Sequence, residues 1–311
     1  MKKCGLMLIL LLMLMLPVMP STLAQDDDAL TDEDLALIEY VSDSFDKLTA
    51  MNSVYTSGTG SASSNIRTER ESFRLEGTVD FSGWTLFEDQ VAYALNLNFS
   101  SESTMFLSAG QRFDMTILTT LRWVDDVLYM RMVDDASETI TPQSLLNDWI
   151  DLTNSDEIFF SSGNLPMLDL MLHAGMGNIY NETSISHINE LPQEILDNGI
   201  EARVFSVELD ASAVATDDSM IRVSEGFNIN TIIVEELSLL EKLMEGATYT
   251  TTLWVNTDTD IVEQVETDLQ YATVSDVGGN ILEDESQSLY LLRYSHFNEA
   301  FEITAPDLDD Q

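Results

Sequence analysis

The chain has 311 residues, 44% of them hydrophobic, and its 55 acidic and 13 basic residues give a formal net charge of −42 at pH 7. Such an acidic surface repels nucleic acid and anionic lipid headgroups at long range, which argues against nucleic-acid binding. The hydrophobic content is sufficient for a real core and excludes a globally disordered chain. The length permits one large domain or two smaller ones.

Residues 1–24 have the pattern of a secretory signal peptide. Lys2 and Lys3 precede an apolar run, and small residues ending at Ala24 form a cleavage site before Gln25. The run is shorter than the roughly 20 residues of a spanning helix, so an uncleaved anchor is the less favoured alternative. Cys4 precedes the run, whereas a lipobox cysteine follows it. We expect a secreted, extracytoplasmic protein without lipid anchor, disulfide or integral membrane segment after cleavage.

An acidic segment at residues 25–31 is expected to form a flexible tether, and an amphipathic helix follows it. Thr31 offers an N-cap hydroxyl, and Asp34 provides the acid of a capping box three residues later. The stretch at 54–65, rich in Ser, Thr and Gly, is expected to be an edge strand or a mobile loop. The predicted helix carries one apolar stripe, formed by Leu35, Ile38, Val41, Phe45 and Leu48.

Apolar and polar residues alternate through most of the sequence between Phe73 and Val133. Successive side chains of a strand point to opposite faces, so this alternation predicts long antiparallel strands with one apolar and one polar face. The apolar positions are rich in Met, Phe and Leu, which suit an adaptable cavity as well as a core.

The middle of the chain is less regular. A helix is predicted to begin at Thr141-Pro142 and to include Trp149 and Ile150. A second, apolar helix is predicted over 167–176, and the glycines beside it make it a candidate lid. A brief extended piece at 185–189 and a break at Leu191-Pro192 precede a strand at 203–209.

The last third of the chain again has clear periodicity. An amphipathic helix is predicted over 231–245, and strands at 249–255 and 261–271 form a hairpin. A final strand at 288–296 leads into a tail. We find no repeat period and no Pro-rich linker, so residues 32–311 are expected to form a single domain.

No catalytic or metal-binding signature is present in the sequence. The three histidines (His173, His187 and His296) are isolated, and nucleophile-elbow, phosphate-loop and dinucleotide motifs are absent. Residues 256–260 carry alternate oxygens like a calcium loop, but Ile261 replaces the required glycine, so a hairpin turn is favoured. We therefore expect a protein that is not an enzyme and has no cofactor or metal.

The order of elements and several short motifs resemble the LppX/LprG group of envelope lipoproteins, in the LolA/LolB-like superfamily. The strand YTTTLWVN (249–256), its turn and the strand IVEQVE (261–266) match the group's pattern of a W-(I/V)-(D/N) strand followed by a hairpin. The ending YSHFNE (294–299) and ITAP (303–306) matches its "F-N … I-x-x-P" close. The helix with Trp149 and the stretch 191–209 also fall in family order.

This resemblance implies an α+β fold: a strongly curved antiparallel sheet, or half-barrel, whose concave face is covered by helices. It also implies that the cavity between sheet and helices takes acyl chains of lipids or lipoproteins. The family's lipobox is absent here, which puts membrane anchoring in doubt.

The sequence thus predicts a non-enzymatic binder or carrier of an apolar ligand, lipid or acyl chains, in the bacterial cell envelope. The alternative is an envelope sensor or interaction module whose groove binds a protein segment. A solid core is the alternative role for each predicted lining residue, and core packing likewise competes with pocket lining for Trp84, Trp123, Trp149 and Trp254. The residues predicted to line the cavity are Phe81, Leu95, Leu97, Phe99, Met115, Ile117, Met130 and Met132.

Overall fold

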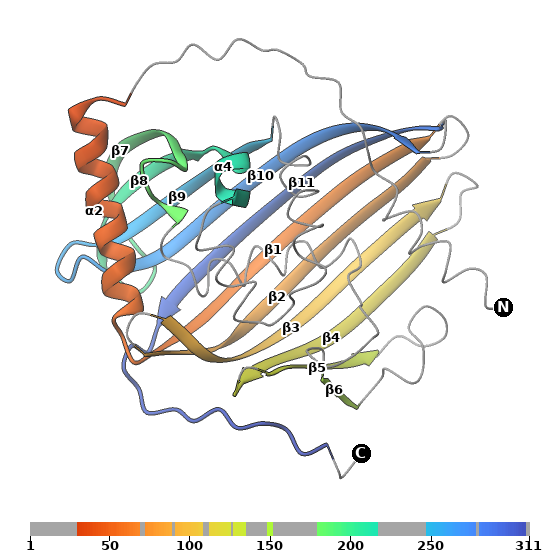
Figure 1. Cartoon of the computed structure of the whole chain (residues 1–311), viewed down its shortest axis with the longest axis horizontal. Coiled ribbons are helices and arrows are strands. Elements are labelled where there is room, and N and C mark those ends of the chain that lie inside the picture. The colour runs from red at the N-terminus through yellow and green to blue at the C-terminus, as the bar shows by residue number, and fades with distance from the viewer. Residues whose placement is uncertain are drawn as a thin grey trace.

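A computed structural model describes residues 30–68, 72–88, 91–107, 112–125, 127–134, 148–151, 179–216, 247–277 and 280–308. These residues form one eleven-stranded antiparallel sheet and two helices, α2 (Asp32–Thr49) and α4 (Ala211–Thr216) (Figure 1). The strands are β1 (Ser53–Thr68), β2 (Ser72–Glu88), β3 (Val91–Leu107), β4 (Arg112–Val124), β5 (Val127–Asp134), β6 (Trp149–Asp151), β7 (Ile185–Ile195), β8 (Glu201–Leu209), β9 (Thr248–Asn256), β10 (Val262–Val277) and β11 (Asn280–Ser295).

The sheet consists of two meanders joined at its middle. Its order is β6-β5-β4-β3-β2-β1-β11-β10-β9-β8-β7, so the first and last strands of the chain are neighbours, and β6 and β7 are the edges. Tyr55 of β1 lies opposite Ser295 of β11 and Trp84 of β2. Figure 1 shows the long strands twisted and curved across the molecule. The predicted single antiparallel sheet is therefore confirmed, as an open one.

Alternation in the strands separates two faces of the sheet. We call the face that carries Phe81, Leu97 and Leu292 the inner face, and the face that carries Asn98 and Arg122 the outer face. The inner-face residues belong to one large cluster of buried apolar side chains that also includes residues of α2. The predicted strands between Phe73 and Val133 are β2 to β5, which confirms the interpretation of the alternation.

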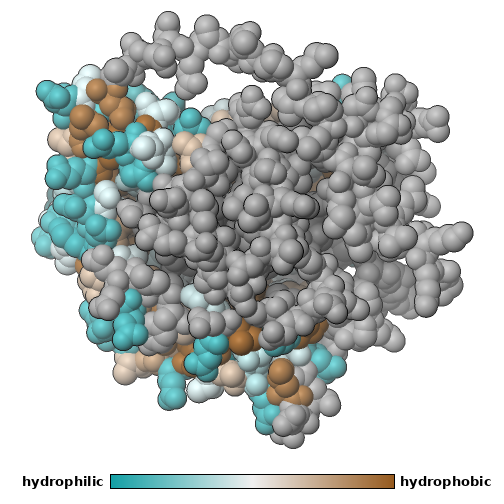
Figure 2. Space-filling model, in the orientation of Figure 1, coloured by the Kyte–Doolittle hydropathy of each residue, from teal (hydrophilic) through white to brown (hydrophobic). Residues whose placement is uncertain are grey.

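Helix α2 is confirmed in detail. The Thr31 side chain accepts a hydrogen bond from the Asp34 backbone, and Asp34 accepts one from the Thr31 backbone, so the capping box is complete. Phe45 stacks on Tyr180 with ring centroids 4.5 Å apart. In Figure 2, hydrophilic residues prevail along the left edge of the molecule, where the exposed side of α2 lies. The buried stripe of α2 includes Ile38, Val41, Phe45 and Leu48.

The expectation for residues 54–65 is wrong, because β1 is a central strand paired on both sides. Its small side chains make room for large neighbours on the inner face. A Cβ at Gly58 would collide with the carbonyl oxygen of Leu291 and the ring of Phe81, and one at Gly60 would collide with the ring of Tyr290. The glycines that suggested a loop are thus required by packing in the middle of the sheet.

Two other expectations fail in the middle of the chain. Trp149 and Ile150 are not helical but belong to β6, which pairs with β5 through Arg131. The predicted break at Leu191-Pro192 is a register shift within β7. An edge strand tolerates proline there, because one side of the β7 backbone has no partner among the described strands.

Several other predictions lie outside the described residues. They are the signal peptide at 1–24, most of the acidic tether, the start of the helix at Thr141, and the helices over 167–176 and 231–245. Among the described helices, none is long and apolar enough to cross a membrane.

The C-terminal tail packs on the outer face. Phe301 stacks on Trp84 at 4.7 Å between ring centroids, and Ile303 is buried in a small cluster with Leu86 and Val124. Arg122 donates a hydrogen bond to the carbonyl oxygen of Thr304 at 3.0 Å. The tail therefore covers the outer side of β2 to β4.

Candidate functional site

The structure brings most of the predicted lining residues together on the inner face of β2 to β5. Met132 is partly buried and packs against the inner-face cluster. Met115 and Ile117 lie in β4, but their side chains are outside what the structure describes. The predicted residues that are at most 6% exposed within the cluster are Phe81, Leu95, Leu97, Phe99 and Met130.

Strand pairing explains why these side chains meet. Phe81 lies opposite Phe99, and their ring centroids are 6.3 Å apart. Leu97 lies opposite Leu121, which in turn lies opposite Met130. These side chains therefore form a continuous apolar layer across four strands, and that layer is buried within the inner-face cluster. Its chemistry is limited to burying apolar groups.

Helix α2 lies at the other end of the sheet, where it makes its main contacts with β7 and β10. Two polar contacts fix the helix to the turn between β9 and β10. The hydroxyl of Tyr40 donates to Asp260 Oδ1, and Lys47 Nζ donates to Asp260 Oδ2, both at 2.9 Å. We call Tyr40, Lys47 and Asp260 the α2 latch. The hydrogen bonds from Lys47 and Tyr40 lower the pKa of Asp260.

Arg203 extends the latch into β7. Its guanidinium group makes two hydrogen bonds of 2.9 Å to the carboxylate of Glu190 and lies 4.1 Å from the ring centroid of Tyr40. This bidentate pair lowers the pKa of Glu190 and raises the pKa of Arg203. The arrangement ties helix and sheet together, and we assign it a structural role.

The hairpin turn predicted at 256–260 is confirmed. Asn256 Oδ1 accepts hydrogen bonds from the backbone of Asp258 and Thr259, and Asn256 Nδ2 donates to Glu263 Oε1 at 2.9 Å. Glu263 is 6% exposed, and burial raises its pKa. Within the described part of the chain, no three His, Cys, Asp or Glu residues are placed to hold a metal ion.

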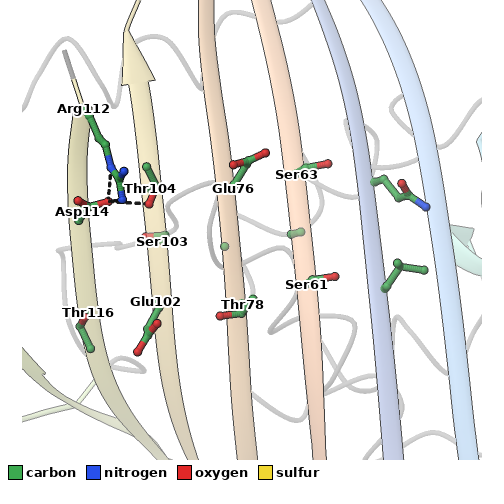
Figure 3. Close-up of a pocket in the computed structure, with 14 residues that line it drawn as sticks. Ser61, Ser63, Glu76, Thr78, Glu102, Ser103, Thr104, Arg112, Asp114 and Thr116 are labelled. Atoms are coloured by element: carbon green, nitrogen blue, oxygen red, sulfur yellow. Dashed lines mark hydrogen bonds and ion pairs between the residues drawn. The ribbon is translucent and has the colours of Figure 1, made fainter. Parts of the chain in front are cut away.

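The outer face carries a shallow polar depression of about 560 Å³. Figure 3 shows hydroxyl and carboxylate side chains from β1 to β4 around it. Asp114 accepts hydrogen bonds from Thr104 at 2.7 Å and from Arg112 at 2.9 Å, and these bonds lower its pKa. Sequence reasoning missed this depression, although its residues occupy the polar positions of the alternation. They include Ser61, Ser63, Glu76, Thr78 and Glu102.

Three of the four tryptophans and the two described histidines have different surroundings. Trp123 belongs to the inner-face cluster, whereas Trp84 packs on the tail, as described above. The indole of Trp254 donates to Glu194 at 2.9 Å. His187 and His296 contact the nearby side chains of Asn189 and Glu299, respectively.

No family model matches the chain, and no curated protein matches it. Among solved structures, it is similar to a DUF1329 family protein from Desulfovibrio piger, with 10% identity over 87% of this chain and 95% of that chain, at a TM-score of 0.27. A protein of the domain of unknown function DUF1849 from Brucella abortus matches with 8% identity over 79% of this chain and 100% of that chain, at a TM-score of 0.17. OccK5 from Pseudomonas aeruginosa matches with 10% identity, 78% and 98% coverage and a TM-score of 0.22. Similarities at this level do not assign the chain to a family.

Proposed function

We propose that this chain is a non-enzymatic binder or carrier of an apolar ligand, lipid or acyl chains, in the bacterial cell envelope. The observation that carries the proposal is the continuous apolar layer on the inner face of β2 to β5, away from the main contacts of α2. The proposal includes a LolA/LppX-like arrangement, in which helices cover the concave face and the ligand lies between them and the sheet.

The energetics of such a site require no specific polar contact. Each buried acyl methylene contributes about 0.8 kcal/mol, so a chain of about ten carbons supplies several kcal/mol. The flexible side chains of Met130 and Met132 suit ligands of variable shape. The rigid rings of Phe81 and Phe99 provide broad contact area beside them.

The proposal is tested by placing one carboxylate on either face of the same strand. Leu97 is 2% exposed on the inner face, whereas its neighbour Asn98 is exposed on the outer face. Asn98→Asp keeps the oxygen that accepts a hydrogen bond from Thr120, so it is a matched control. Leu97→Asp should abolish binding of a fluorescent fatty acid, and Asn98→Asp should leave binding unchanged. Met130→Asp repeats the inner-face change on β5.

Circular dichroism on the same samples separates a cavity from a solid core. Water can enter a cavity around the new carboxylate, so Leu97→Asp should remain folded. In a solid core an unpaired carboxylate costs several kcal/mol and unfolds a protein whose stability is about 5–15 kcal/mol. Unfolding of both inner-face variants, or unchanged binding, contradicts the proposal. Native mass spectrometry of the purified protein should also detect a bound lipid rather than a bound peptide.

A further inference from the structure

Two arginines and one tryptophan lie together on the outer face beside β6, an edge strand of the sheet. Arg131 of β5 is directly opposite Trp149 of β6, and Arg122 of β4 is opposite Tyr129, two residues before Arg131. The guanidinium carbons of Arg122 and Arg131 lie 4.8 and 5.0 Å from the centroid of the Trp149 ring. We call these three residues the Arg–Trp cluster. Two cations therefore share one aromatic ring.

The charge balance at the cluster differs from that of most other basic residues that the structure describes, although Arg67 also has no described carboxylate partner. Among the residues that the structure describes, no carboxylate lies within 4.0 Å of a side-chain nitrogen of Arg122 or Arg131. This is unusual in a chain with a net charge of −42. In the described part of the chain, the basic residues with a carboxylate partner at this distance are Lys47, Arg74, Arg112, Arg203 and Arg293.

Only part of the hydrogen-bonding capacity of the two guanidinium groups is used: Arg122 donates from one Nη atom to the carbonyl oxygen of Thr304. The Nε atoms of Arg122 and Arg131 are buried, and neither has a hydrogen-bond acceptor among the described residues. Burial and the neighbouring charge of Arg131 lower the pKa of Arg122. A partly buried pair of like charges is costly unless an anion compensates it. The cluster therefore carries two positive charges and N–H donors that the described carboxylates do not neutralise, which an anionic ligand would compensate.

We propose that the Arg–Trp cluster binds a phosphate group, either free phosphate or the headgroup of a phospholipid. A guanidinium group presents a planar fork of N–H donors that matches phosphate oxygens, and stacking on the indole fixes the plane of that fork. Burial, together with the negative charges of Asp151 and Asp125, raises the pKa of Tyr129, so carboxylates also lie in the surroundings of the cluster. The attraction between the cluster and an anion is therefore short-ranged, and it favours an anionic group that contacts both arginines.

This inference is independent of the proposed apolar site, because the cluster lies on the opposite face of the sheet. Trp149 provides the measurement, since an anion that contacts the two arginines changes the environment of the indole. Tryptophan fluorescence is followed during titration with inorganic phosphate and, separately, with dihexanoyl phosphatidic acid below its micelle concentration. A saturable change that is lost in Trp149→Phe is expected. Saturation by both probes indicates free phosphate recognition, and saturation by the lipid alone indicates a headgroup site.

Three variants test which cations are responsible. Arg122→Gln and Arg131→Gln should each weaken binding by about tenfold or more, because each removes one fork of charged donors. Arg112→Gln is the matched control, since Arg112 is also on β4 and on the outer face but is paired with Asp114 at 2.8 Å. It should leave binding unchanged. Absence of a saturable change in the unmodified protein, or equal weakening by Arg112→Gln, overturns the proposal. The titration of the unmodified protein is decisive even where a variant fails to fold.

Discussion

The two halves of the inner face are similarly apolar, but they differ in what packs against them. On the β7–β10 side, α2 inserts Val41 and Phe45 into the cluster, and the α2 latch fixes the helix from outside. On the β2–β5 side, Leu97 and Met130 are just as buried, yet the main contacts of α2 lie elsewhere. The same alternation of residues thus supplies a helix-packed core in one half and a candidate ligand surface in the other. What covers an apolar face decides its role.

Matched phenylalanine truncations give the largest expected effect and test this comparison directly. Phe45→Ala should lower the free energy of unfolding by about 3–5 kcal/mol, because Phe45 is 1% exposed and stacks on Tyr180. Phe99→Ala on the β2–β5 side should cost clearly less if Phe99 lines a cavity. Urea unfolding of the two ligand-free variants measures both losses. Equal losses would mean that both halves are solid core.

Gly58→Ala should lower the free energy of unfolding by about 1–3 kcal/mol, since the new methyl group would collide with Leu291 and Phe81 at the seam between the two meanders. Gly77→Ala is the comparison variant and should cost less, because a Cβ there makes only a tight contact of 3.3 Å with the carbonyl oxygen of Glu102 instead of a collision. Thermal and urea unfolding compare the two. A tolerated Gly58→Ala would show that Phe81 can move, and would weaken the description of a fixed apolar wall.

The α2 latch should contribute less to the free energy of unfolding than the packing at Phe45 and Gly58. Asp260→Asn keeps a residue that tolerates the positive φ of 52° but removes the charge, so the free energy of unfolding should fall by about 0.5–1 kcal/mol at pH 7. The folded-state pKa of Asp260 lies below its usual value of 3.8. Its stabilisation is therefore present above that value and is lost as the pH falls through the folded-state pKa. The difference between unmodified protein and variant should disappear at low pH. A constant difference would assign the effect to something other than the charge.

Glu263→Gln should change the free energy of unfolding by a similarly small amount, but with the opposite sign. Burial raises the pKa of Glu263, so its contribution is most favourable below the unfolded-state pKa and declines as the pH rises through the folded-state value. Gln keeps an oxygen that can accept from Asn256 but carries no charge. The variant should be more stable at pH 7 by up to about 1 kcal/mol, and the gain should vanish at low pH. A loss of stability at pH 7 would mean that the ionised carboxylate is needed in the turn.

Regular alternation allowed most of the sheet to be predicted from sequence. β2 to β5, β8 and the β9–β10 hairpin all alternate, and the capping box located the start of α2. β1 was missed because its central position depends on partners from both ends of the chain, which local composition does not reveal. β6 was missed because Trp149 and Ile150 also fit a helical stripe, and pairing with β5 outweighed that preference.

The candidate sites were predictable to different degrees. The inner-face residues share one parity in their strands, so the spacing of apolar residues alone is enough to group Phe81, Leu97 and Met130. The Arg–Trp cluster draws one residue from each of three strands, and its assembly depends on the pairing of β5 with β6. One signal was available: Arg122 and Arg131 both occupy polar positions on either side of the turn at Asp125.

The pairing of β1 with β11 determines when the sheet can be completed as the chain is made. Tyr55 of β1 pairs with Ser295 of β11, which is synthesised much later. One edge of β1 therefore stays unpaired until nearly the whole polypeptide is available. Contacts this distant in sequence slow folding, because a very long loop must close before they form. An exposed edge strand can meanwhile pair with other chains. The polar, glycine-rich sequence of β1, poor in the residues that aggregate, protects that edge during the delay.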